Sequence, residues 1–369
     1  MNRIASWIKS WVTKYRSHKN EEKQSSLVAQ TTSQKNHDFY QNYFSLIANG
    51  ARLKLVEAMF NLNLFALFEK KPFILEHEII KSLELQPIRA KKWLNLLCSE
   101  DFLIKKGQGK KVAYQLSEGF MKLTQCEHWE TTKFYFSLST VAENENLTDA
   151  LRFGKVDEGY ANWAWPPNTQ EQSAWLEDWM TKTASHSIRS LLERINFDQT
   201  NHLLDVGGGD GTVACALVTA HPHLRATVYN LPASAEIARQ RIESKGLSHR
   251  VNVIEGDFIE EHTFPGRYDL ILFTRVLFDW NERVNRKLLK MAYSALQKNG
   301  CVAICEFFKE DNRDICLASE YRYIFIDALD VNLMKTMAEY RSMLSDIGFS
   351  MMPYKKINQS RSSVLLAQK

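Results

Sequence analysis

Two aspartates and four glycines lie close together in the segment Asp205-Val206-Gly207-Gly208-Gly209-Asp210-Gly211. Leu203 and Leu204 before it begin a short apolar run that predicts a buried strand, and residues 212–218 predict a helix that starts directly afterwards. A strand, a glycine turn and a helix N-terminus form a ligand-sized cradle at the carboxyl edge of a parallel sheet. Acidic side chains beside this turn, Asp205 and also Asp210, would repel a phosphate and favour a ligand with a cationic group.

The ends of the next two predicted strands supply further groups. Asn230-Leu231-Pro232 follows the strand predicted for residues 226–229, where a side chain could bind a ribose. Gly256-Asp257-Phe258 follows the strand predicted for residues 251–254, where an acid and a ring could hold an adenine. Three strand ends that point the same way fit S-adenosylmethionine as cofactor. The alternative is an α/β core whose glycine turns bind no ligand.

The elements that must position these groups form an α/β fold. Residues 199–369 alternate predicted strands and helices, as a doubly wound, Rossmann-like sheet requires. Further strands are predicted at residues 268–273 and 300–306, and a closing strand pair at 349–357 and 363–367.

Residues 36–125 predict a separate domain of helices followed by a hairpin over residues 101–116. Helices followed by a hairpin are typical of a winged helix, which could bind DNA through Lys91 and Lys92 or serve dimerisation or substrate capping. Attachment to a cofactor-binding domain favours dimerisation. Residues 126–198 are helical and aromatic and predict a bridge that contributes to the acceptor pocket.

The chain has 369 residues, enough for two cores, and a net charge of +4. Residues 1–35 hold seven Lys or Arg against two Glu, so the rest sums to −1, which argues against a nucleic-acid partner. Six cysteines without a C-x-x-C pair predict neither a metal site nor a disulfide framework. The cysteine pattern favours the reducing cytoplasm. No apolar run is long enough for a transmembrane helix or a signal peptide.

The first sixteen residues predict a short basic amphipathic helix within the flexible tail of residues 1–35. Its apolar positions recur at helical spacing, with basic residues among them: Ile4, Trp7, Ile8, Trp11, Val12 and Tyr15. Such a helix could lie on the anionic inner membrane surface as a peripheral contact, or dock on the body of the protein or on a partner subunit.

Taken together, these motifs resemble the small-molecule O-methyltransferases of the caffeic-acid O-methyltransferase type. The chain is more similar still to their bacterial relatives that act on hydroxylated carotenoids, bacteriochlorophyll precursors and prodigiosin-type pyrroles. The resemblance spans residues 38–368 and includes the segments Leu147–Lys155 and Thr274–Trp280 besides the motifs above. It implies a homodimer with a class I methyltransferase domain and an N-terminal winged-helix dimerisation domain.

The resemblance also implies a set of cofactor-binding residues. Asp205, Gly207 and Gly209 would hold the methionine end, Asn230 and Leu231 the ribose, and Asp257 and Phe258 the adenine. Thr274, Arg275 and Trp280 would form the far wall, and Met180 would lie beside the transferred methyl group.

The sequence departs from the family at three places. The family's catalytic base is a histidine immediately before Asp-Trp, and Phe278 stands there. Glu306 matches a glutamate that helps to hold this histidine, whereas the second such glutamate falls at Met334. Asn230 stands where the family usually has Asp, although its amide can still bind ribose hydroxyls.

Without that histidine, the catalytic candidates are His186, Glu306 and Asp279. His186 lies six residues after Met180 on the helix that leads into the sheet, and His128 and His262 are the next candidates. The alternative role for Asp279 is to cap the helix after Trp280. A base matters less where the acceptor hydroxyl is already acidic.

The sequence therefore predicts a methyltransferase that acts on a hydroxyl of a conjugated, lipophilic secondary metabolite, such as a phenol, a hydroxypyrrole or a hydroxylated polyene. Alternatives are C- or N-methylation, a relative that binds the cofactor without methylating, and a winged-helix regulator. The acceptor pocket is predicted to take a flat aromatic or polyene guest, and the alternative is that its residues belong to the ordinary core: Tyr321, Tyr323, Phe325, Met334, Met337, Trp163, Trp165 and Phe134.

Overall fold

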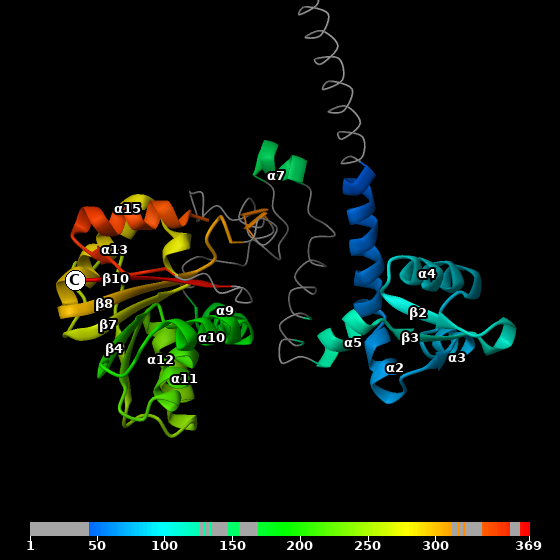
Figure 1. Ribbon diagram of the computed structural model, residues 1–369, viewed down its shortest axis with the longest axis horizontal. Coiled ribbons are helices and arrows are strands. Elements are labelled where there is room, and N and C mark those ends of the chain that lie inside the picture. Colours follow the sequence, from blue (N-terminus) through cyan, green and yellow to red (C-terminus); the bar gives the residue numbers. More distant parts are fainter. Residues whose placement is uncertain are drawn as a thin grey trace, which may run out of the picture. The chain divides into compact units, whose positions relative to one another are not determined.

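The computed structural model describes residues 44–125, 129, 133, 147–154, 169–311, 316–317, 320–321, 334–354 and 362–369. The chain forms two compact units, Met1–Trp129 and Glu130–Lys369 (Figure 1). Several predictions lie outside the described residues: the helix over residues 4–15, His128, and the pocket residues Phe134, Trp163, Trp165, Tyr323 and Phe325.

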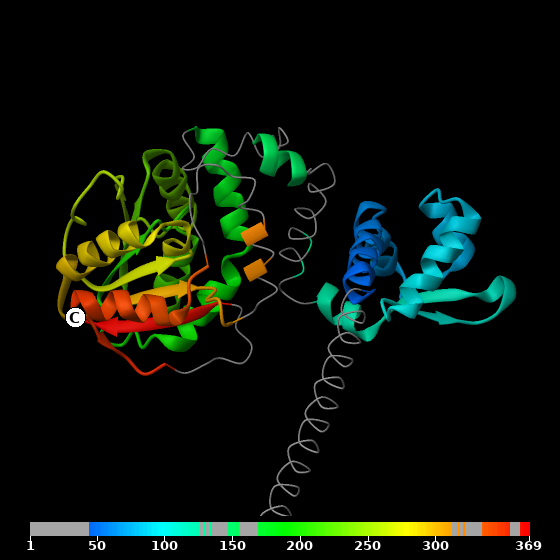
Figure 2. The same cartoon turned by 90° about the horizontal axis from the view of Figure 1, so that it is seen from above.

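The described part of the first unit consists of short helices and a small antiparallel sheet. Its helices are residues 44–61, α2 (Leu64–Lys70), α3 (Glu76–Ser82), α4 (Pro87–Ser99) and α5 (Glu118–Gln125). Its strands β1 (Ile74–Leu75), β2 (Leu103–Lys106) and β3 (Ala113–Leu116) pair in the order β1-β3-β2. The hairpin of β2 and β3 is cyan in Figure 2, and it lies within residues 101–116, where the sequence predicts a hairpin.

A seven-stranded mixed sheet forms the centre of the second unit, in the order β6-β5-β4-β7-β8-β10-β9. Its strands are β4 (His202–Val206), β5 (Arg225–Asn230), β6 (Val251–Glu255), β7 (Tyr268–Thr274), β8 (Leu296–Glu306), β9 (Ser350–Met351) and β10 (Ser363–Gln368). The first five are parallel, whereas β10 is antiparallel to both β8 and β9. The chain leaves β4 toward β5 and returns to its other side at β7, which opens a crevice between these strand ends.

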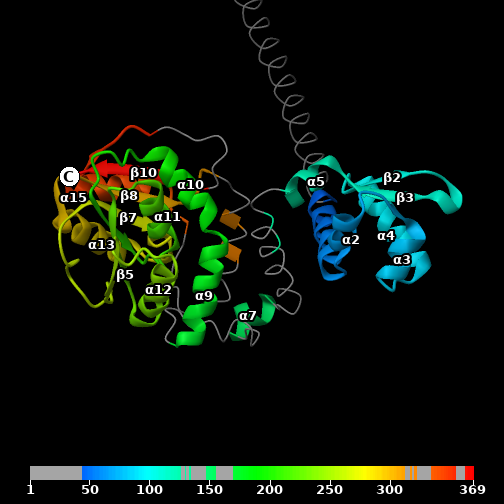
Figure 3. The same cartoon turned by 90° about the horizontal axis from the view of Figure 1, so that it is seen from below.

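Alternating side chains on β4 enter two different cores. Leu203 packs with residues of α10 (Ala184–Arg194), α11 (Thr212–Ala220) and α12 (Pro232–Ser244). Leu204 and Val206 pack with α13 (Glu282–Ala295) and α15 (Met337–Ile347) on the opposite face. Figures 1 and 3 show these two helical layers around the sheet. Because side chains alternate along a strand, Asp205 lies on the face of Leu203.

Two further helices are described in this unit, and polar caps fix the starts of two others. Helix α9 (Gln170–Lys182) precedes α10, and α7 (Leu147–Phe153) lies earlier in the chain. Asn281 caps α13 by accepting a hydrogen bond from the Val284 amide, so the alternative role of Asp279 as this cap is wrong. Thr336 and Glu339 form a reciprocal capping box at the start of α15.

Candidate active site

A narrow crevice lies at the carboxyl end of β4, where the sequence places its glycine turn. It encloses about 30 Å³, room for about two water molecules. Its lining comes from helices α9 and α10, the glycine turn, the start of α11 and the end of β7: Glu177, Met180, Thr181, Ala184, Asp205, Gly207, Gly208, Gly209, Asp210, Thr212, Val213, Thr274 and Arg275.

The glycines of the turn leave no room for side chains. Gly207 and Gly209 have φ of 64° and 58°, a left-handed conformation that favours glycine. A Cβ at Gly208 would lie 2.7 Å from Asp205 Oδ2, and one at Gly209 would collide with Glu177 Oε2. The backbone therefore approaches both carboxylates closely.

Asp205 lies fully buried beneath the turn. Neither of its carboxylate oxygens has a hydrogen-bond partner of good geometry among the described residues. Burial raises the pKa of Asp205 to about 7, and the backbone amide of Ala214 partly offsets that effect. A cationic group in the crevice would stabilise its ionised form.

Asp210 has a structural role, unlike the cation-binding role that the sequence suggests for it. Its Oδ2 accepts hydrogen bonds from the Thr181 hydroxyl at 2.5 Å and from Arg241 Nε at 2.6 Å. Its Oδ1 accepts from the Thr212 amide at 3.0 Å. The carboxylate therefore ties α9, α12 and the first turn of α11 together.

Arg275 connects the end of the sheet to the junction of α9 and α10. Its guanidinium donates to the Thr183 hydroxyl at 2.5 Å and to the Met180 carbonyl at 2.9 Å. Its backbone has φ of 57°, a conformation that costs a non-glycine residue roughly 1–2 kcal/mol. Such strain is typical of residues whose side-chain direction is fixed by a binding site.

Glu177 is a crevice residue that the sequence interpretation missed. It lies on α9 one helical turn before Met180, and 4% of its surface is exposed. Oε2 has no hydrogen-bond partner in the part of the chain that is described. Burial raises the pKa of Glu177 to about 7. The available signal was an acid on the helix that leads into the glycine turn, too common to be noticed without the fold.

The residues predicted at the ends of β5 and β6 lie in two places, at the glycine turn and in the loop after β6. Asn230 donates from Nδ2 to the Gly209 carbonyl at 2.9 Å, so it contacts the turn, and Leu231 follows it as the N-cap residue of α12. Asp257 accepts from the Ile259 amide at 2.8 Å and shapes the loop after β6. The rings of Phe258 and Trp280 meet edge to face, 5.6 Å apart.

Glu306 holds backbone at the position where the resemblance implies a held histidine. Oε1 accepts hydrogen bonds from the amides of Val276, Leu277 and Phe278, at 3.2, 2.7 and 3.2 Å. Oε2 accepts from the Tyr340 hydroxyl at 2.5 Å. The carboxylate is fully buried, and burial raises its pKa, with the Tyr340 hydrogen bond opposing that effect.

Lys335 is the second residue that the sequence interpretation missed. Its ammonium donates to the carbonyls of Leu277 and Phe278 at 3.3 and 3.4 Å, and 8% of the residue is exposed. Burial lowers its pKa, while the carboxylates of Glu306 and Asp279 oppose the shift. The turn that carries Phe278 is therefore held through both kinds of backbone group: Glu306 accepts from its amides, and Lys335 donates to its carbonyls.

None of the described histidines is among the residues that line the crevice. His186 is half-buried on α10, whose lining residue is Ala184, and His262 is exposed. Of the described acceptor-pocket residues, Met334 is buried, Met337 packs against the core of the sheet, and Tyr321 is 37% exposed.

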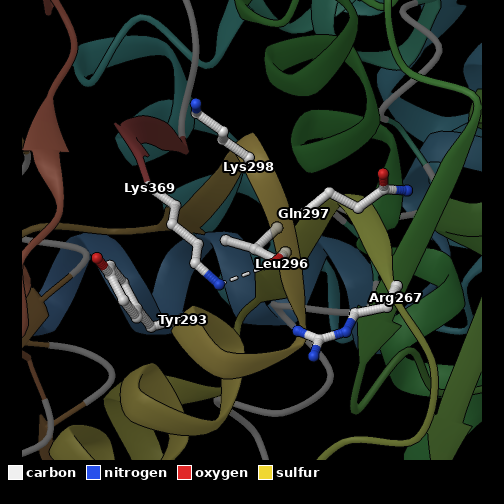
Figure 4. A pocket seen from close by; sticks show the side chains of 6 residues that line it. All are labelled: Arg267, Tyr293, Leu296, Gln297, Lys298 and Lys369. Carbon is white, nitrogen blue, oxygen red and sulfur yellow. Dashed lines mark hydrogen bonds between the residues drawn. The ribbon is translucent and has the colours of Figure 1, made fainter.

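A larger hollow of about 690 Å³ lies at the opposite edge of the sheet, near the start of β8 (Figure 4). Its lining residues are Arg267, Tyr293, Leu296, Gln297, Lys298 and Lys369. Lys369 donates from Nζ to the Leu296 carbonyl at 2.8 Å, and Arg267 donates to the Ser294 carbonyl. The lining contains no residue of the glycine turn, so we place the candidate site at the narrow crevice.

The groups that line the crevice suit the cationic end of a ligand that approaches the backbone closely. Two buried carboxylates, Asp205 and Glu177, present oxygens without partners among the described residues, beside glycines that allow no Cβ. Among the same residues, no cluster of His, Cys, Asp and Glu could hold a metal ion. S-adenosylmethionine matches this set of groups through its amino group and its sulfonium.

Comparisons with known proteins agree with this geometry. The O-methyltransferase domain family matches residues 144–350. The chain is 26% identical to an L-tyrosine C(3)-methyltransferase of Streptomyces lavendulae over 85% of this chain and 87% of that protein. It is 32% identical to a 3-hydroxy-5-methyl-1-naphthoate 3-O-methyltransferase of Streptomyces sahachiroi over 44% of this chain and 47% of that protein. The solved structure of the S-adenosylmethionine-dependent methyltransferase SibL has the same fold, with a TM-score of 0.70, 23% identity and coverage of 86% and 96%.

Proposed function

The chain belongs to the O-methyltransferase domain family, and from that premise we propose that it is an S-adenosylmethionine-dependent methyltransferase acting on a hydroxyl of a conjugated secondary metabolite. The observation that carries the proposal is the pair of buried carboxylates at the glycine turn. Asp205, Gly207, Gly209 and Met180 would hold the methionine end. We assign the ribose to Asn230 and Leu231, the adenine to Asp257 and Phe258, and the far wall to Thr274, Arg275 and Trp280.

The bound cofactor supplies a methyl group on a sulfonium, which leaves as a neutral thioether. The protein's contribution is therefore mainly to orient the acceptor oxygen in line with the methyl group and to exclude water. The rigid attachment of α9 and α10 through Arg275 and Asp210 serves this orientation.

Because position 278 is a phenylalanine, another group must remove the proton from the acceptor. Glu306 already accepts four hydrogen bonds, so we propose that it positions the Phe278 turn and does not act as a base. His186 is the candidate base, and Asp279, the residue after Phe278 in the chain, is the second candidate. An acceptor with an acidic hydroxyl, such as a phenol or hydroxypyrrole, lessens the demand for a base.

The test is transfer of labelled methyl from S-adenosylmethionine to a panel of phenols, hydroxypyrroles and hydroxylated polyenes. We expect Phe278→His to change the rate less than about threefold, because both oxygens of Glu306 already accept hydrogen bonds that fix the turn, and His186→Ala to lower it about 10²-fold. Phe278→Tyr is the matched control. A rise of about 10² in Phe278→His would contradict this assignment, and no transfer to any acceptor would contradict the function.

C- or N-methylation is the second candidate. It is favoured by Phe278, since loss of the base is most tolerable where no O–H must be deprotonated, and by the similarity to a tyrosine C(3)-methyltransferase. The NMR connectivity of the methylated product distinguishes the two.

We propose that the first unit is a winged-helix dimerisation domain, within the division 1–35, 36–125, 126–198 and 199–369. Its helix over residues 44–61 exposes a set of large apolar side chains, which supports a second copy as partner: Phe44 (66%), Leu46 (69%), Ile47 (54%) and Leu53 (45%). Light scattering of Phe44→Ser/Leu46→Ser should show a monomer, whereas the wild type should be a dimer.

A further inference from the structure

Two buried carboxylates face the crevice from different elements. Asp205 ends β4 beneath the turn, whereas Glu177 reaches Gly209 from α9. Glu177 Oε2 has no hydrogen-bond partner among the described residues, although only 4% of this side chain is exposed. Burial of carboxylate oxygens that accept no hydrogen bond is unfavourable, and no lysine or arginine among the described residues forms an ion pair with Asp205 or Glu177, so each group favours a cationic neighbour.

The charges of the ligand differ before and after methyl transfer. S-adenosylmethionine carries an amino group and a sulfonium, whereas its product S-adenosylhomocysteine keeps the amino group and has a neutral sulfur. One carboxylate can therefore bind the amino group that both ligands share. The other can stabilise the sulfonium charge, which methyl transfer removes.

We propose that Glu177 is the specificity residue that distinguishes the charged cofactor from its neutral product, releasing a proton to solvent when the cofactor binds and recovering one when the sulfur is neutral. This inference rests on the proposed function. It assigns Asp205 to the shared amino group, since that carboxylate lies beneath the turn on the sheet itself.

The surroundings of Glu177 place its proton near balance at neutral pH. Burial raises the pKa to about 7, and the Asp210 carboxylate also raises it. The Ser234 hydroxyl of α12, the Asp210 amide and the Arg275 guanidinium lower it. Arg241 of α12 is paired with Asp210, so the Arg275 guanidinium and the unpartnered Asp205 carboxylate are the remaining charges in the crevice lining.

The direction of the pH effect follows. A nearby sulfonium lowers the pKa of Glu177 below its value in the free protein, so affinity for the cofactor falls as the pH drops below about 7. A neutral sulfur leaves the pKa unchanged. The contribution of Asp205 cancels in the ratio of the two affinities.

Calorimetry in buffers of different ionisation enthalpy measures both the number of protons released on binding and the affinity for each ligand. Between about pH 6 and pH 8.5, we expect the wild type to release more protons with S-adenosylmethionine than with S-adenosylhomocysteine, and the affinity ratio to change about tenfold, equal to one pKa unit. Glu177→Gln should lose both differences. Glu171→Gln, an exposed acid on the same helix, is the matched control and should behave as the wild type.

The wild-type pH series keeps the test decisive if Glu177→Gln does not fold. Equal proton release with both ligands in the wild type, or a difference that persists in Glu177→Gln, would overturn the inference. A wild type that binds neither ligand would instead overturn the proposed function.

Discussion

At the scale of single residues, the turn that carries Phe278 depends on one buried carboxylate. Three amides and the Tyr340 hydroxyl converge on Glu306, while Lys335 holds two carbonyls of the same turn. All four hydrogen bonds to Glu306 are strengthened by the charge of the carboxylate and by the low dielectric of the core. The arrangement stabilises the backbone conformation of the turn through contacts that do not involve the side chain at position 278.

Removal of the Tyr340 hydroxyl tests this network. We expect Tyr340→Phe to lower the free energy of unfolding by about 1–3 kcal/mol, because Glu306 Oε2 would remain buried without its donor. Urea unfolding followed by fluorescence measures the change. Tyr293→Phe, at a partly exposed ring on α13, is the control, and equal stability of both variants would contradict the role of Glu306.

At the scale of elements, helix α9 is positioned by contacts to three neighbours. Arg275 binds the Met180 carbonyl from the end of β7, and Asp210 connects Thr181 to Arg241 on α12. The rigidity of the crevice wall therefore depends on these polar contacts. Their geometry depends on a forked guanidinium, which a lysine cannot replace.

We expect Arg275→Lys to weaken S-adenosylmethionine binding about tenfold and to speed amide hydrogen exchange over residues 170–182, because lysine lacks the planar fork that directs a separate N–H group to each acceptor. Arg239→Lys, in an exposed pair with Glu255, is the matched control. Unchanged exchange over α9 in Arg275→Lys would show that α9 is held by other contacts.

At the scale of the whole molecule, the two carboxylates of the crevice set a pH dependence of stability. The pKa values of Asp205 and Glu177 are both raised to about 7, so between about pH 4 and pH 7 the folded chain binds more protons than the unfolded chain. Their contribution to stability therefore falls as the pH rises through that window.

The variant Asp205→Asn isolates this effect from the other titrating groups. We expect the wild type to lose more stability than Asp205→Asn between pH 4.5 and pH 7.5, in urea unfolding without cofactor, by an amount of order 1 kcal/mol or more. Parallel pH profiles for the two proteins would contradict the raised pKa of Asp205.

Residues 1–35 lead to a separate prediction for the whole molecule. We propose that their basic amphipathic segment binds anionic membranes, where a lipophilic acceptor would partition. The full chain should co-sediment with anionic vesicles and not with neutral ones, and a chain beginning at His37 should bind neither. Equal co-sedimentation of both chains would contradict this role. The described residues contain no helix long and apolar enough to cross a bilayer.

Whether a feature of this molecule can be predicted from the sequence depends on how far apart in the chain the interacting residues lie. The glycine turn and the strands were predictable because their signals are local, such as a run of glycines after a short apolar run. Glu177 and Lys335 gain their importance from neighbours distant in sequence, and no local pattern marks them. The cap of α13 lies at Asn281, two residues beyond Asp279, where the side-chain oxygen accepts a hydrogen bond from the Val284 amide.

The antiparallel position of β10 has a consequence for synthesis of the chain. Strand β8 ends at Glu306, but its partner β10 begins only at Ser363 and also supplies the pairing of β9. At roughly 5–20 residues per second, a ribosome leaves that edge of the nascent sheet unpaired for several seconds. An unpaired edge can pair with other chains, so a chaperone that covers β8 during translation should determine the yield of the folded enzyme.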